Sequence, residues 1–314
     1  FLREMEFNRL LSSAISAYGE PNLTSIKNEV KIEKNQKAIN KKEYYLIENL
    51  EQIDNWITEA EELGEVAVDT ETNSLDPHQA DLVGVSLSSK IGKACYIPIG
   101  HKSNKCIEKD LVLKKLKPLL EDPSIKKIGQ NIKFDFIVFF KHGINMTSME
   151  DTMLMSYVLD AGKNRHNMDT LSEIHLNHKT ISFKDLVGTG KKEINFSEVD
   201  VEKAKDYAAE DADITFRLYK KFQKSLKDEK MINIYEIFEK PLLKILAHME
   251  IEGVKIDNKF LKSLSNKFEK KIIKIQNEVF KISKKEFNIA SPKQLGEILY
   301  NDLKIADLKK TKKG

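Results

Sequence analysis

The chain is poor in cysteine, proline and tryptophan, and it has no long apolar run. Its 314 residues include 2 Cys, 7 Pro, 13 Gly and 1 Trp, a composition that excludes collagen-like and low-complexity proteins. Two cysteines, Cys95 and Cys106, cannot form a disulfide framework or a four-ligand zinc site, so we expect a reducing compartment. The longest solid apolar runs, such as Phe136 to Phe140, are too short to span a membrane or to act as a secretory signal.

Charge, by contrast, is abundant and unevenly distributed. Residues 231–314 hold 18 Lys and 11 acidic residues, a net charge of +7, whereas the remainder holds 34 basic and 38 acidic residues, a net charge of −4. A basic tail beside an acidic body suits a protein that binds a polyanion with one part and metal ions with another. Solvated helix faces are the alternative explanation. Because the chain begins with Phe1, we expect it to be a piece of a longer protein.

Hydrophobic patterning predicts an α/β domain with a mixed central sheet. The solidly apolar run Val66–Val68 is typical of a strand buried on both faces, and residues 82–99 indicate an antiparallel hairpin. The expected strands lie at 44–47, 66–68, 82–87, 94–99 and near 127–128. One expected helix ends near residue 63. The other expected helices span 108–121, 131–142, 151–160 and 201–226.

We divide the chain into three parts. Residues 1–43 combine a short amphipathic helix with a polar linker. Residues 44–235 form the α/β domain. Residues 236–314 show long, Lys-rich helical patterns with no strand signal, so we expect an all-helical segment there.

Acidic residues at the end of the expected 66–68 strand form the first candidate metal site. Asp69 and Glu71 flank Thr70, and side chains two positions apart on a strand point to the same face. The two-acid pattern alone is weak in a chain with 49 acidic residues. Its position is the stronger argument, because α/β sheets bind ligands and metals at their strand ends.

Asp135 lies in a helical segment, 132–140, that is apolar on nearly every side. An ionised carboxylate buried there is costly unless it is paired or binds a metal. An exposed position in the first turn of the helix is the alternative. Asn131 would share the face of Asp135 or cap the helix.

Tyr207 and Asp211 lie four residues apart on the expected 201–226 helix and therefore share a face. That face otherwise consists of Ala, Ile, Leu and Phe, so it is the core-facing stripe and both polar side chains need partners. Glu210 and Asp213 fall off this stripe, and we expect them on the solvated surface.

Three segments that met at one sheet edge would bring together four carboxylates, those of Asp69, Glu71, Asp135 and Asp211. Such charges repel one another and persist only with cations between them. Oxygen-only ligands favour Mg²⁺ or Mn²⁺ over zinc. Two ions about 4 Å apart would hold a phosphodiester and activate water for in-line displacement.

Three motifs in this order resemble those of the 3′-5′ exonuclease domain in the bacterial DNA polymerase I family (family A). They are DTETNSLD at 69–76, GQNIKFD at 129–135 and YAAEDAD at 207–213. Their order and spacing match the DEDD superfamily in its tyrosine subtype, because position 206 is Asp where the histidine subtype has His. The resemblance extends from residue 44 to the C-terminus. It implies an RNase H-like exonuclease fold followed by the start of the polymerase domain.

The resemblance also implies a role for each acidic residue. Asp69, Glu71 and Asp211 would hold the catalytic metal, with Asp135 supporting a second ion. Tyr207 and Glu71 would orient the attacking water, which a metal makes easier to deprotonate.

Substrate contacts follow from the same resemblance. Leu75 and Phe183 would wedge and stack the terminal bases, which tolerates any base, with ordinary core packing as the alternative. The further contacts to the terminal nucleotide and phosphate would be Gln130, Asn131, Arg165 and His166.

The function implied is a 3′-5′ exonuclease that proofreads DNA and releases nucleoside monophosphates with two Mg²⁺ or Mn²⁺ ions. The sequence ends before any palm or fingers motif, so we expect no polymerase active site. A catalytically silent DNA-binding module and an exoribonuclease of the same superfamily are the alternatives. The expected partners are a single-stranded or frayed 3′ end and the rest of a polymerase chain. We expect a monomer in the bacterial cytoplasm, without membrane contact.

Overall fold

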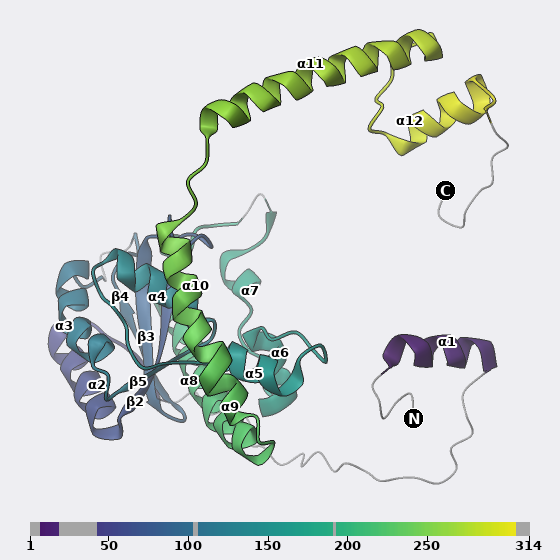
Figure 1. Ribbon diagram of the computed structural model, residues 1–314. Coiled ribbons are helices and arrows are strands. Elements are labelled where there is room, and N and C mark those ends of the chain that lie inside the picture. The colour runs from purple at the N-terminus through teal and green to yellow at the C-terminus, as the bar shows by residue number, and fades with distance from the viewer. Residues whose placement is uncertain (1–6, 19–42, 103–105, 191–192, 306–314) are drawn as a thin grey trace. The chain divides into compact units, whose positions relative to one another are not determined.

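The computed structural model of the protein contains a six-stranded sheet with helices beside it (Figure 1). The structure describes residues 7–18, 43–102, 106–190 and 193–305. The strands are β1 (Glu43–Leu46), β2 (Glu65–Thr72), β3 (Leu82–Lys90), β4 (Lys93–Pro98), β5 (Lys126–Gly129) and β6 (Met149–Asp151). The helices are α1 (Asn8–Tyr18), α2 (Leu50–Leu63), α3 (Lys109–Glu121), α4 (Ile132–Lys141), α5 (Thr152–Asp160), α6 (Met168–Leu176), α7 (Phe183–Val187), η2 (Phe196–Glu198), α8 (Val201–Asp228), α9 (Ile232–Ile234), η3 (Tyr235–Glu239), α10 (Lys240–Glu252), α11 (Asn258–Ser283), α12 (Pro292–Gly296) and η4 (Glu297–Asp302).

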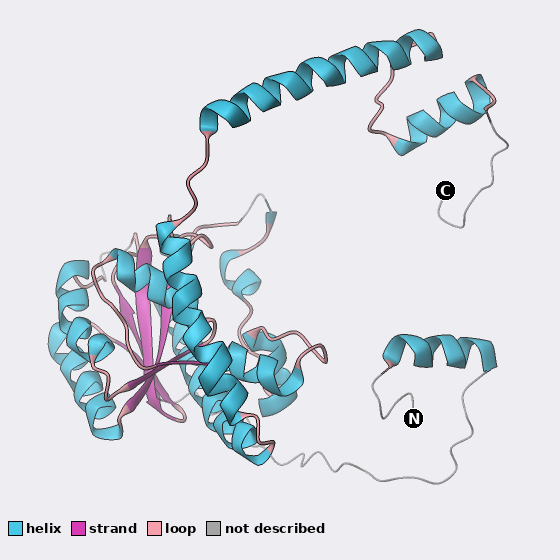
Figure 2. Cartoon of the chain, in the orientation of Figure 1, coloured by secondary structure: helices cyan, strands magenta, loops and turns pink. Residues whose placement is uncertain are grey.

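The sheet is mixed, as the sequence predicts, and Figure 2 shows it in magenta with helices packed around it. Its strand order is β1-β4-β3-β2-β5-β6. β3 runs antiparallel to both of its neighbours, β2 and β4, whereas the other neighbouring strands are parallel. The strands predicted from hydrophobic patterning are all present.

β2 is an interior strand, hydrogen-bonded to β3 on one edge and β5 on the other. Its residues Val66, Ala67 and Val68 are fully buried, which explains the solidly apolar run. The strand is longer than the predicted 66–68 and includes Asp69 and Glu71. The pairing with β5 ends at Ala67, so Asp69 and Glu71 lie on the part of β2 that is paired with β3 alone.

Helices cover both faces of the sheet. α2, α3 and α4 contribute to one core, which includes Ile53, Leu116 and Phe136. α8 packs on the opposite face, against β1 to β5. Its apolar residues Ile214 and Phe222 belong to a second core with α5 and α6. The long helix thus carries its polar residues directly over the sheet.

The prediction that Glu210 and Asp213 lie on the solvated surface is wrong, because both side chains are fully buried. Asp213 accepts hydrogen bonds from the Tyr44 hydroxyl (2.8 Å), the Gly92 N–H (2.8 Å) and Arg217 Nε (2.9 Å). A single apolar stripe on α8 predicts only one buried face of the helix. In the structure β1 and the β3–β4 turn cover a further side of the helix, and Asp213 satisfies their donors.

Glu210 faces the segment that leads to α7. Its carboxylate accepts a hydrogen bond from the Ile181 N–H (2.6 Å) and pairs with His178 Nε2 (3.0 Å). The burial of Glu210 is therefore explained by a loop that packs against α8, which no helical pattern within residues 201–226 could reveal.

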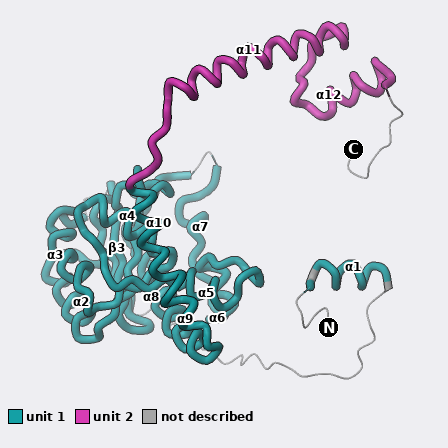
Figure 3. Tube along the Cα trace, in the orientation of Figure 1, with its two compact units in different colours: residues 1–251 teal, residues 252–314 magenta. Residues whose placement is uncertain are grey.

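The described chain divides into two compact units, residues 1–251 and 252–314, shown in teal and magenta in Figure 3. α10 belongs to the first unit, where its Leu243 and Ala247 join the core around α4. The secondary-structure elements among the described residues of the second unit are all helices, as expected for the tail. The division into folding domains near residue 235 stays a prediction. The linker predicted at 19–43 lies outside the described residues, except for Glu43.

Among the described residues, no helix combines the length and the apolar character that crossing a membrane requires.

The hydrogen bonds that the buried Asp213 accepts lead to a prediction about stability. Asp213→Ala leaves the Tyr44 hydroxyl, the Gly92 N–H and the Arg217 guanidinium without their acceptor, so we expect it to lower the free energy of unfolding by about 3 kcal/mol. Asp206→Ala on the same helix removes an exposed ion pair with Lys205 and should cost less than about 1 kcal/mol.

Denaturant unfolding followed by tryptophan fluorescence measures both variants. The single tryptophan, Trp56, is buried in α2 and reports on the first unit alone. Equal losses in the two variants would contradict the importance given to the buried network.

Candidate active site

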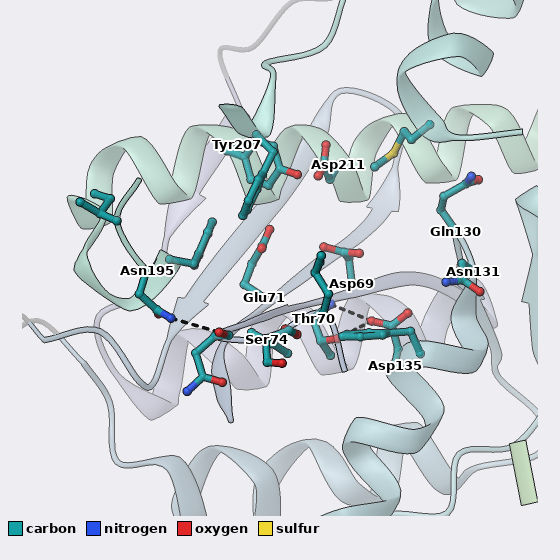
Figure 4. Close-up of a pocket in the computed structure, with 18 of the residues that line it drawn as sticks. Asp69, Thr70, Glu71, Ser74, Gln130, Asn131, Asp135, Asn195, Tyr207 and Asp211 are labelled. Atoms are coloured by element: carbon teal, nitrogen blue, oxygen red, sulfur yellow. Dashed lines mark hydrogen bonds between the residues drawn. The ribbon is translucent and has the colours of Figure 1, made fainter. Parts of the chain in front are cut away.

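Three carboxylates meet between β2 and α8 (Figure 4). Asp69 and Glu71 come from β2 and Asp211 from α8, and one oxygen of each lies within 4.8 Å of the others. Asp69 is half-buried, whereas Glu71 and Asp211 are buried. The expectation that alternation along the strand brings both β2 carboxylates to one face is confirmed.

Asp135 lies beside this group, in the first turn of α4, and it is buried. Its Oδ1 accepts hydrogen bonds from the Thr70 N–H (2.9 Å) and the Thr70 hydroxyl (2.5 Å). The alternative of an exposed first-turn aspartate is therefore wrong. Thr70, which lies between the two β2 acids, fixes Asp135 relative to them.

Burial and mutual repulsion govern the protonation of these acids. Burial raises the pKa of Asp69 to about 6. The pKa of Glu71 is raised well above its ordinary value, mainly by burial and further by the negative charges of its neighbours. The pKa of Asp211 is also raised, by burial and then by Asp69, although a hydrogen bond from Tyr207 opposes the shift. A nearby cation would remove this penalty.

The donor set fits a divalent metal ion. Glu71 Oε1 is buried and has no hydrogen-bond partner among the described residues. A buried carboxylate oxygen without a partner is costly, and a cation beside it would satisfy it. The three clustered residues offer only oxygen ligands, which suits Mg²⁺ or Mn²⁺. Asp69, Glu71 and Asp211 are thus the residues that could hold such an ion, with Asp135 adjacent.

Around the carboxylates the surface opens into a pocket of about 580 Å³. Tyr207, Leu75 and Phe183 line it together with the four acids. Leu75 is 93% exposed and Phe183 42% exposed, so ordinary core packing does not explain either side chain. Both apolar groups are instead available to a molecule bound in the pocket.

The remaining predicted contacts divide into two pairs. Gln130 and Asn131 line the pocket. Arg165 and His166 do not belong to its lining, and Arg165 is exposed. The backbone carbonyl of His166 accepts a hydrogen bond from Gln130 Nε2 (2.7 Å), so the two segments are in contact. Whether these residues touch a substrate stays a prediction.

Asp151 supports the site and was not identified from the sequence. Its carboxylate accepts hydrogen bonds from the N–H groups of Asn131 (3.2 Å) and Ile132 (3.0 Å), and also from the Met153 N–H (2.8 Å) of α5, the helix that begins directly after Asp151. The Asn131 side chain makes no capping hydrogen bond, so Asp151 caps α4 in its place. From the sequence, an Asp directly before a helix indicates that it caps that helix. Its cap on α4 arises only in the folded protein.

Family comparison assigns the fold that surrounds this pocket. Residues 44–227 match the model of the 3′-5′ exonuclease family found in family A DNA polymerases. The chain belongs to the 3′-5′ exonuclease family of DNA polymerase I. Residues 258–314 match the start of the DNA polymerase family A model, so this exonuclease domain is followed by a polymerase segment. The α/β architecture is the RNase H-like exonuclease fold that the resemblance implied.

Individual relatives agree with this assignment. DNA polymerase I of Rhizobium leguminosarum is 41% identical over 293 residues, which cover 86% of this chain and 29% of the relative. The chain thus spans under a third of the length of such relatives.

Solved structures share the fold. The POL domain of Pol1 from M. smegmatis, in complex with DNA primer-template and dNTP, gives a TM-score of 0.66 at 20% identity and covers 86% of this chain and 43% of its own. Brucella melitensis NrnC with bound Mg²⁺ gives 0.51 at 24% identity, over 71% of this chain and 98% of its own.

The raised pKa of Asp69 predicts a pH-dependent stability for the metal-free exonuclease domain. An aspartate titrates near pH 4 in the unfolded chain but near pH 6 here, so folding favours its protonated form. The stability that this protonation contributes is complete below about pH 4 and is lost as pH rises through 6. Asp69→Asn removes the buried charge, and its stability relative to wild type should increase with pH by about 2 kcal/mol between pH 4 and 7.

Unfolding in EDTA, followed by Trp56 fluorescence across this pH range, measures the difference. A stability difference that stays constant with pH would contradict the electrostatic account of the cluster.

Proposed function

We propose that this exonuclease domain hydrolyses the 3′-terminal phosphodiester of DNA in a metal-dependent reaction, and that it serves as the proofreading part of a DNA polymerase I. The observation that carries the proposal is the buried, unpartnered Glu71 Oε1 within a group of three carboxylates at the base of an open pocket. No described residue donates a hydrogen bond to this oxygen, and a divalent cation would compensate its charge.

Asp69, Glu71 and Asp211 would hold the catalytic ion, and Asp135 would support a second one. Bound there, two divalent ions would supply a more acidic water and would offset charge on the phosphate. The NrnC structure with bound Mg²⁺ supports the choice of ion by its shared fold. The residues themselves determine where the water and the phosphodiester lie.

Tyr207 and Glu71 would orient the attacking water. Burial and the surrounding acids raise the pKa of Tyr207 well above its ordinary value, so the phenol keeps its proton at neutral pH. Tyr207 therefore acts as a hydrogen-bond donor and not as a base. Glu71 would accept a hydrogen bond from the water through the carboxylate oxygen that does not bind the ion.

The apolar residues at the mouth explain how any base could be accepted. Leu75 and Phe183 provide a wedge and a stacking surface, and stacking does not discriminate among bases. A preference for DNA over RNA rests on the polymerase segment that follows the domain. The polymerase chain and a frayed 3′ end are the partners that this role requires.

A labelled strand tests the proposed reaction. With Mg²⁺, a 5′-labelled single-stranded DNA should give a ladder that shortens from its 3′ end and releases nucleoside monophosphates. EDTA should abolish the ladder. Asp211→Ala removes one of the three clustered carboxylates, so we expect at least about a hundredfold slower digestion.

Asp206→Ala, an exposed acid on the same helix, is the matched control and should digest at the wild-type rate. A wild-type protein that binds the strand but leaves it intact would support a silent binding module. Faster digestion of an RNA strand of the same sequence would favour an exoribonuclease.

A further inference from the structure

We propose that Asn195 is a positioning residue for the DNA end, because it connects the loop that carries Leu75 to the aromatic cluster beneath Phe183. The link would fix the two apolar sides of the pocket relative to each other. This inference rests on the proposed function and adds to it a residue that controls how the strand is held.

The side chain of Asn195 makes two different hydrogen bonds. Its Oδ1 accepts from the Ser197 N–H (3.0 Å) and so caps the short helix η2. Its Nδ2 donates to the Asn73 carbonyl (3.0 Å), a contact drawn as a dashed line in Figure 4. The cap decides the orientation of the amide, because only the oxygen can accept from Ser197. The nitrogen is thereby directed at the loop after β2.

That loop is closed on itself by its own hydrogen bonds. Asn73 and Asp81 are joined by three of them, from the Asn73 N–H to the Asp81 carbonyl (3.1 Å), from the Asp81 N–H to Asn73 Oδ1 (2.7 Å), and from Asn73 Nδ2 to Asp81 Oδ2 (3.1 Å). Ser74 Oγ accepts from the Asp76 N–H (3.1 Å) inside the loop. Leu75 projects from this ordered loop into solvent, so the position of the loop sets the position of the leucine.

On the other side of the link lies Phe196, the next residue in the chain, which is buried. Its ring stacks on Phe183 with centroids 6.2 Å apart and an interplanar angle of 3°. The Tyr207 ring lies 6.1 Å from Phe196 and 6.0 Å from Phe183. Asn195 thus contacts the Leu75 loop, and the adjacent Phe196 contacts the stacking phenylalanine and the proposed catalytic tyrosine.

The aromatic cluster is itself supported from behind. The His101 ring lies 5.8 Å from Phe196, and its Nε2 is hydrogen-bonded to the Tyr96 hydroxyl (2.7 Å). The Lys102 N–H donates to the Ser197 carbonyl (2.8 Å). Because these contacts join η2 to β4 and to the chain that follows it, the Leu75 loop is connected through Asn195 to the sheet.

The consequence depends on the length of the substrate. A strand with two or more bases would contact both Leu75 and Phe183, so it is sensitive to the distance between them. A mononucleotide has one base and cannot be wedged at a base step. Breaking the link should therefore weaken the binding of strands and leave mononucleotide binding nearly unchanged.

Two substitutions break the link and keep the cap. Asn195→Asp and Asn195→Ser both retain an N-cap acceptor for Ser197, but the Asp carboxylate has no donor and the Ser hydroxyl is too short to reach Asn73. For each, we expect the Kd of hexathymidylate in EDTA to rise about threefold to tenfold, the value of one neutral hydrogen bond. The Kd of thymidine 5′-monophosphate should change less than about twofold.

In Mg²⁺, the same variants should show an increased KM for the oligonucleotide and little change in kcat. Asn49→Ser, which alters the N-cap of α2 away from the pocket, is the matched control and should bind both ligands like wild type. Equal weakening toward both ligands, an effect of Asp without an effect of Ser, or no effect would each overturn the positioning role. Because binding is measured without catalysis, a wild-type protein that binds but does not cleave refutes the proposed function separately.

Discussion

Three carboxylate oxygens within 4.8 Å of one another, in a site largely withdrawn from water, impose the main electrostatic cost of this structure. The raised pKa of Asp69 and the unpartnered oxygen of Glu71 are two expressions of that cost. A fold tolerates such a cluster only if its backbone prevents the acids from separating or if cations compensate them. Here Asp69 and Glu71 are paired with β3, the Thr70 N–H between them is hydrogen-bonded to Asp135, and α8 is buried along much of its length. Relaxation is therefore restricted, which leaves compensation by cations.

The scaffold achieves this restriction with buried acids that have no proposed chemical role. Asp213 joins α8 to β1 and to the β3–β4 turn, and Glu210 joins the same helix to the loop that leads to Phe183. Asp151 caps α4 and so fixes the helix that presents Asp135. These three carboxylates accept hydrogen bonds from backbone N–H groups, whereas Glu71 has an oxygen with no partner. This contrast separates the structural acids from Glu71, which keeps a carboxylate oxygen available to an ion.

Local pattern was enough to predict five strands of the sheet and the main helices, but not the short strand β6. Together with the motif resemblance, it also predicted the gathering of Asp69, Glu71, Asp135 and Asp211 in one pocket. The two-residue period of a strand and the four-residue spacing of a helix relate only residues that are close in the chain. The motif resemblance indicated which distant segments meet at the site. The same reasoning failed for Glu210 and Asp213, because a helical stripe describes one buried face and α8 has more than one. It also missed the link between Asn195 and Asn73, which are 122 residues apart and carry no shared pattern. Contacts between loops depend on the completed fold.

Titration with Mn²⁺ followed by electron paramagnetic resonance tests whether this carboxylate cluster is a divalent-cation site. We expect saturable binding of up to two ions per chain in the wild-type protein. Glu71→Gln, which replaces the unpartnered oxygen by a neutral amide of the same shape, should lose at least one of them. Binding that is equal in the two proteins, or absent from both, would contradict the claim.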